Sequence, residues 1–182
     1  MKMGPAVRKL ALTAHVISSV GWLGAVTASL ALGVAAVTSR HEPTIRGIYL
    51  TLELMAIWVL VPLSVASLAT GLIQSFGTVW GLFRHYWVLA KLVINLFASL
   101  VLLLYTQTLD SFAAVAGRAP ASEDLLMLRS PSVAIHSAGA MVLLVVATVL
   151  SVYKPRGMTR YGQRKQPSAA RRTPTQPATV PL

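Results

Sequence analysis

The sequence predicts an all-α protein in which four transmembrane helices form a bundle, followed by a disordered basic tail. Four apolar runs cover residues 10–37, 48–76, 86–108 and 133–153, and about 20 apolar residues in a helix span the hydrocarbon core of a bilayer. The chain is 55% hydrophobic and only 12% charged, and its apolar runs lack the period-two alternation of barrel strands. We therefore expect one membrane domain over 1–153 and a separate tail over 154–182.

The first run follows three basic residues, as in a secretory signal peptide, but it exceeds the roughly 7–15 apolar residues typical of such peptides. We interpret it as the first transmembrane helix. His15 and Trp22 lie on one of its faces, seven residues apart. Another face carries a small residue at every fourth position, which predicts a ridge that lets a second helix approach closely: Gly21, Ala25, Ser29 and Gly33.

The second and third runs each contain a seam of recurring polar residues. In the second, Glu53 begins a seam that repeats every seven residues through Ser67 and Gln74, and Pro62 should bend the helix because proline removes a backbone hydrogen bond. In the third, Lys91, Asn95 and Ser99 are four residues apart and share one face. The fourth run is aliphatic beyond His136, which lies near its start. We therefore expect Glu53, Asn95 and His136 to be buried polar residues.

The ionisable residues in these runs need an explanation, because each costs roughly 2.5–3.5 kcal/mol at the centre of a membrane helix. At 1.5 Å per residue, His15 and Lys91 lie about 10 Å from one membrane surface. Glu53 and His136 lie near the other, so the two layers are too far apart to share one metal ion.

Each of these residues also has a purely structural interpretation. Lys91 can extend to the headgroups, and His15 can be a neutral ring bonded to Ser19 or to a carbonyl. Glu53 and His136 can form a hydrogen bond with each other.

Basic residues predict the topology. Lys2, Arg8 and Lys9 precede the first run, and seven basic residues follow the last, from Lys154 onward. The positive-inside rule then places both termini on the cytoplasmic side. We expect the membrane to be a bacterial plasma membrane. The tail from Lys154 contains five prolines and no acidic residue, so we expect it to be disordered and to bind anionic lipids. We expect no nucleic-acid binding.

The chain contains no cysteine. This excludes disulfides, iron–sulfur clusters held by cysteine, thiolate copper sites and haem attached through a CxxCH motif.

Three short motifs resemble those of a known group of proteins: His15 with Trp22-Leu23-Gly24, Trp87 with Lys91-Leu92, and Ala69-Thr70-Gly71-Leu72. Over roughly residues 8–108 the chain resembles the small membrane proteins of the HemJ-type protoporphyrinogen oxidase and CopD-type families. The resemblance implies haem b as a cofactor, with His15 as the ligand of the metal and Lys91 as a second ligand or the partner of a propionate. The fourth run and the tail do not match the oxidases, and the tail is similar to uncharacterised actinobacterial membrane proteins.

Three functions follow from these observations. The first is a multi-pass plasma-membrane protein that binds b-type haem between its first and third helices, with the reaction left open. The second is a small transporter or copper-handling membrane protein, which would need ionisable residues along one continuous path. The third is a non-catalytic scaffold, subunit or homo-oligomer whose ridges of small residues bind other helices.

Overall fold

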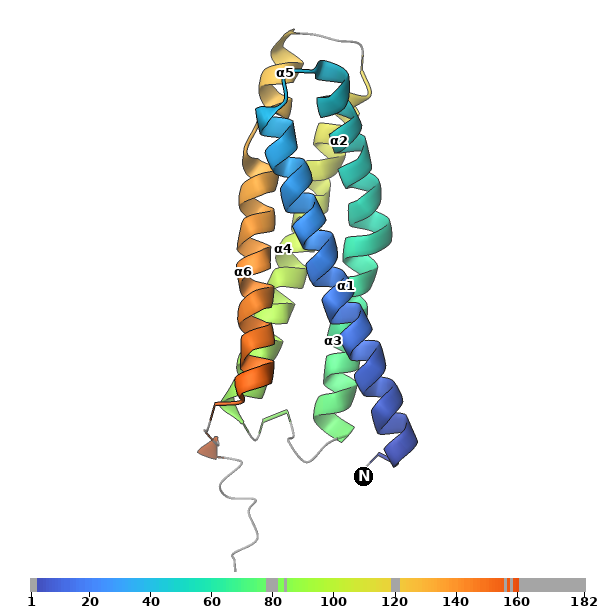
Figure 1. Cartoon of the computed structure of the whole chain (residues 1–182), viewed down its shortest axis with the longest axis vertical. Helices are drawn as coiled ribbons and strands as arrows, with labels where there is room; N and C mark the ends of the chain where they lie inside the picture. The colour runs from blue at the N-terminus through green and yellow to red at the C-terminus, as the bar shows by residue number, and fades with distance from the viewer. Residues whose placement is uncertain are drawn as a thin grey trace, which may run out of the picture.

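Four long helices lie side by side in the computed structural model, which describes residues 3–77, 82–83, 85–118, 122–155, 157, 159 and 160 (Figure 1). The elements in chain order are α1 (Pro5–Thr38), α2 (Glu42–Met55), the π-helical turn η1 (Ala56–Leu60), α3 (Val61–Gly77), α4 (Tyr86–Ala116), α5 (Ser122–Leu128) and α6 (Ser132–Tyr153). Together α2, η1 and α3 form the second membrane span. The predicted all-α four-helix fold is confirmed. The predicted disorder of the tail falls mostly on residues outside the described ranges.

The helices extend beyond the apolar runs that predicted them. The first begins at Pro5 rather than residue 10, with proline in the first turn, where its missing N–H is not needed. The second begins at Glu42 rather than residue 48, and α4 continues to Ala116 rather than residue 108. Apolar runs mark the part of a helix that lies in hydrocarbon, whereas the backbone hydrogen bonds continue into the polar residues at either end.

The second span is irregular at its centre. The π-helical turn over Ala56–Leu60 ends two residues before Pro62. The proline ring lacks an N–H and would clash with the carbonyl of Trp58, four residues earlier, in a regular helix. We predicted a bend at Pro62, and the structure has this π turn beside it. The Trp58 side chain is 74% exposed and points away from the bundle, as expected of a residue that faces lipid.

The α1 helix crosses the bundle, so that its two halves contact different neighbours (Figure 1). Its second half packs on α6, where a Cβ atom built on Gly33 would lie 2.8 Å from the backbone nitrogen of Ala134. Its first half packs on α3, where Gly21 faces Leu63. The predicted ridge of small residues therefore serves packing within this chain, and its Gly33 end is covered by α6.

Apolar side chains occupy both the interior and the outer surface of the bundle. Trp22, Tyr49 and Leu52 are among the buried core residues, while large apolar side chains are exposed along all four spans. Such a surface suits hydrocarbon rather than water. The start of α1 and the end of α6 lie at the same end of the bundle (Figure 1), as four spans require.

Candidate functional site

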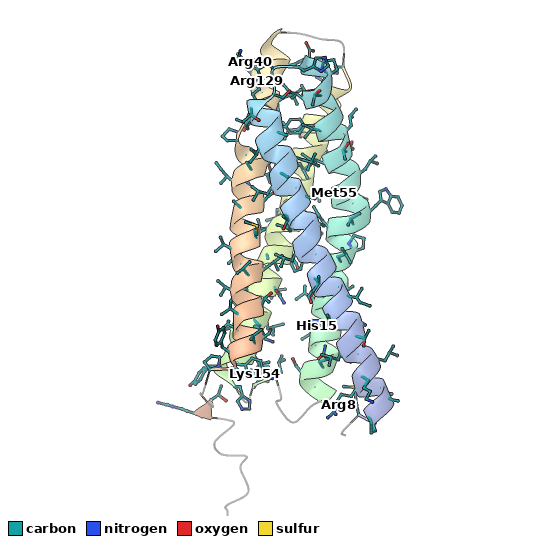
Figure 2. All side chains as sticks on the ribbon, in the orientation of Figure 1. Arg8, His15, Arg40, Met55, Arg129 and Lys154 are labelled. Atoms are coloured by element: carbon teal, nitrogen blue, oxygen red, sulfur yellow. The ribbon has the colours of Figure 1, made fainter. Side chains whose placement is uncertain are left out.

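His15 is held between α1 and α3, at the end of the bundle that carries Arg8 and Lys154 (Figure 2). Its Nδ1 lies 3.1 Å from Thr70 Oγ1. The Thr70 hydroxyl in turn donates to the Ala66 carbonyl at 2.6 Å, so its proton is already used. With the Thr70 proton on the Ala66 carbonyl, a neutral imidazole would carry its proton on Nδ1 and donate it to Thr70, and Nε2 would keep its lone pair.

The residues around this imidazole fix its position. A Cβ atom on Gly71 would lie 3.2 Å from His15 Cε1, so glycine gives the ring its space. One turn away, Gln74 Nε2 donates to the Ala11 carbonyl at 3.3 Å and joins the same two helices. The motif Ala69-Thr70-Gly71-Leu72 is thus the part of α3 that receives the histidine. The imidazole also interacts with the backbone of Ser67, one turn before Gly71 on the same helix.

Lys91 lies on α4 and binds α6 rather than His15. Its Nζ donates to Ser151 Oγ at 3.1 Å and lies 4.7 Å from the centroid of the Trp87 ring. Ser151 donates onward to Ala147. By residue count, Ser151 is closer to the end of the bundle than His15, so the ammonium extends toward the membrane surface. No hydrogen bond joins Lys91 to His15, because each side chain bonds a different helix.

Two further polar side chains lie above Lys91 on the same face of α4. Asn95 is half-buried and forms no hydrogen bond with any residue that the structure describes. The Ser99 side chain is 4% exposed, and its Oγ has no partner among the described residues. An unpartnered buried hydroxyl costs about 1–3 kcal/mol, so this seam retains hydrogen-bonding capacity that the helices leave unused.

The outer pair is arranged differently from our expectation. His136 Nδ1 donates to the carbonyl of Ser132 at 2.8 Å, and its ring stacks on Tyr105 with centroids 4.2 Å apart. Glu53 is half-buried on α2 and forms no hydrogen bond with a described residue. The predicted hydrogen bond between Glu53 and His136 is therefore wrong, because the proton on Nδ1 of His136 is donated to the backbone of its own helix. The prediction that His136 is buried is also wrong, since the residue is exposed near the start of α6.

Sequence reasoning also missed the role of Arg46, which precedes the second apolar run. It lies on α2, where its Nε donates to Glu42 Oε1 at 2.8 Å. Its Nη1 lies 3.1, 2.9 and 3.1 Å from the carbonyl oxygens of Val115, Ala116 and Arg118. A guanidinium there satisfies carbonyls at the C-terminus of α4 and complements its dipole. The spacing of Glu42 and Arg46, four residues apart, was the available signal that this segment is helical.

Four described helices are long and apolar enough to cross a bilayer, and polar groups are held between them. The chain therefore has the architecture of a multi-pass helical membrane protein. No protein-family model matches the chain, and searches of curated proteins and of solved structures find no similar protein. The resemblance to the HemJ-type and CopD-type families stays a prediction from its short motifs.

Proposed function

We propose that this membrane protein binds a b-type haem, whose iron would be held by His15 Nε2. The observation that carries the proposal is the hydrogen bond between His15 Nδ1 and Thr70 Oγ1. Histidines that bind metals commonly donate their other ring N–H to a protein oxygen, which fixes the ring and directs the lone pair to the metal. The bond from Nδ1 to Thr70 has this form.

The donor set of the described residues suits haem better than a bare metal ion. Across those residues, no group of three or more His, Cys, Asp or Glu side chains is placed to hold a metal ion. Haem needs fewer protein ligands than a bare metal ion, because the macrocycle supplies most of the ligands and one or two side chains complete the set. A single well-oriented histidine is then sufficient.

Lys91 supports the proposal as a partner for an anion. Its ammonium donates to Ser151 in the present arrangement, and a protonated amine has no lone pair to give to iron. A haem propionate is a carboxylate, and it would pair with the positive charge that Lys91 carries near this end of the bundle. Of the two roles inferred from the resemblance, we therefore propose the propionate partner.

Bound haem would supply one-electron chemistry, and the chain's own residues would position and insulate it. Thr70 and Gly71 hold the imidazole, and Lys91 offers a positive charge. These features support electron transfer or a haem-dependent oxidoreduction as the class of function. The alternatives are a small transporter or copper-handling protein and a non-catalytic scaffold. The following experiment distinguishes the haem protein from both.

Protein purified in mild detergent from haem-replete cells should show a Soret band and a reduced α-band. Both should be lost in His15→Ala, because the axial nitrogen is removed. His136→Ala is the matched control, since it removes another histidine from a membrane helix and should leave the spectrum unchanged. A colourless protein that also fails to bind added haem would contradict the proposal.

The variant Thr70→Val keeps His15 but removes the hydrogen bond that orients its ring, and so tests that bond alone. Valine keeps the shape of threonine but cannot accept the Nδ1–H bond. Loss of such a bond typically weakens metal binding about 10–100-fold, so haem titration should give a correspondingly weaker affinity with the spectrum retained. Equal affinities would mean that Thr70 has only a packing role.

We also propose that the end of the bundle with His15 faces the cytoplasm, as the basic residues beside α1 and after α6 suggest. The cysteine-free chain allows single cysteines to be placed at Ser39, after α1, and at Ser168, in the tail. A membrane-impermeant thiol reagent added to intact cells should label position 39 and leave position 168 unlabelled. The reverse pattern would invert the proposed topology.

A further inference from the structure

A second site lies in the other half of the bundle, away from His15. A cavity of about 520 Å³ opens among α1, α4 and α6, a volume within the range of roughly 300–1,000 Å³ of small-molecule sites. Its inner wall includes Trp22 and Val26. The exposed side chains Phe97, Ile135 and Val142 also line it, so the cavity is open to the surrounding lipid between α4 and α6.

One end of this apolar cavity is polar. His136 and Ser137 line it where α6 begins. Because His136 Nδ1 donates to the Ser132 carbonyl at 2.8 Å, the Nε2 atom of the neutral ring is an acceptor. Neither Nε2 nor the Ser137 hydroxyl has a hydrogen-bond partner among the described residues. Nε2 can therefore accept one hydrogen bond, and the serine hydroxyl can donate another.

This pattern selects the chemistry of a ligand. A hydroxyl group both donates and accepts, and so matches Nε2 and the serine together. An ester or ether oxygen has no proton to give to Nε2. A phosphate or carboxylate would bring a negative charge to a cavity lined by no Lys or Arg side chain, where it would lie unpaired in an apolar setting.

We propose that the cavity binds a neutral long-chain lipid alcohol, with its hydroxyl at His136 and Ser137 and its chain directed toward Trp22. The hydroxyl then lies near the start of α6, and the chain runs toward the middle of the bundle, at the depth of the hydrocarbon. The opening between α4 and α6 lets such a lipid enter sideways from the bilayer. This site shares no residue with the proposed haem site.

The test uses the full-length protein in phosphatidylcholine vesicles with a photoreactive octadecanol that carries a diazirine in its chain. Adducts should map by mass spectrometry to 97–109 and 135–143. Unlabelled octadecanol should compete at about three- to tenfold lower concentration than octadecyl methyl ether, the effect of one hydrogen bond. Dioleoylglycerol and geranylgeraniol, used as further competitors, distinguish a glyceride from an isoprenoid source of the hydroxyl.

Two variants and a control locate the binding. His136→Ala should remove the advantage of the alcohol over the ether. Gly139→Phe should abolish labelling by filling the cavity, because Gly139 lines it and a Cβ atom there meets nothing within 4 Å. Gly24 has the same open surroundings and does not line the cavity, so Gly24→Phe should label normally.

Two results would overturn the proposal. Both are measured on the unaltered chain, so neither requires that a variant folds correctly. One is competition by the methyl ether as strong as by the alcohol. The other is labelling spread over lipid-facing positions such as Trp58, which would mean that phospholipid chains fill the cavity without selection.

Discussion

Gly33→Ala is expected to destabilise the protein by about 1–3 kcal/mol, the usual cost of forcing extra atoms into a packed contact. The new Cβ would lie 2.8 Å from the Ala134 backbone nitrogen and 3.1 Å from its Cα. Backbone atoms within a helix cannot rotate away as a side chain can, so α1 and α6 would have to separate. The measurement is the thermal or denaturant unfolding transition in mild detergent.

Gly24→Ala on the same helix is the matched control, because a Cβ atom there meets nothing within 4 Å. Alanine favours helix over glycine by about 1 kcal/mol, so this variant should be as stable as the original protein or more stable. Glycine-to-alanine substitution is therefore expected to lower the stability at Gly33 and to preserve or raise it at Gly24. Equal unfolding transitions for both variants would mean that α1 and α6 do not approach each other this closely at Gly33.

Arg46→Ala is the second change with a large expected effect. It removes the bond to Glu42 and the guanidinium that meets the carbonyls at the end of α4. Hydrogen bonds to charged groups contribute about 1.5–3 kcal/mol each, and the Arg46 side chain is only 13% exposed, so water replaces them poorly. We expect a loss of at least this size in the free energy of unfolding.

Arg46→Lys keeps the charge but loses the planar fork of donors, and should recover only part of the stability. Arg40→Ala controls for the loss of one positive charge at this end of the bundle, since Arg40 is exposed. Its effect should stay within about 0.5 kcal/mol. If Arg40→Ala costs as much as Arg46→Ala, then net charge rather than capping of α4 accounts for the loss.

The spans and the fold could be predicted from the sequence because hydrocarbon imposes length and composition on each helix. The partners of polar side chains could not be predicted in the same way. They depend on how each helix is rotated against its neighbours, and a shared depth does not specify that rotation. Glu53 and His136 illustrate the limit, since His136 bonds its own backbone instead.

The site around His15 could be predicted in part. The sequence singled out His15 and the motif from Ala69 to Leu72, and the structure brings them together through Thr70 and Gly71. Lys91 was placed at a similar depth, but its long side chain reaches Ser151 on α6. Sequence spacing locates a backbone position, whereas a lysine ammonium lies several bonds away from it.

The π-helical turn at Ala56–Leu60 sets the angular phase between the two halves of the second span. The buried residues Leu52, Ala56, Leu60 and Ser64 are each four positions apart. In a regular helix, four residues overshoot one turn by about 40°, and three such steps would carry Ser64 about 120° away from the interior. The wider turn absorbs this excess. A chain with one residue fewer here would turn Thr70 and Gly71 by about 100° relative to α2, and His15 would lose both of the residues that hold it.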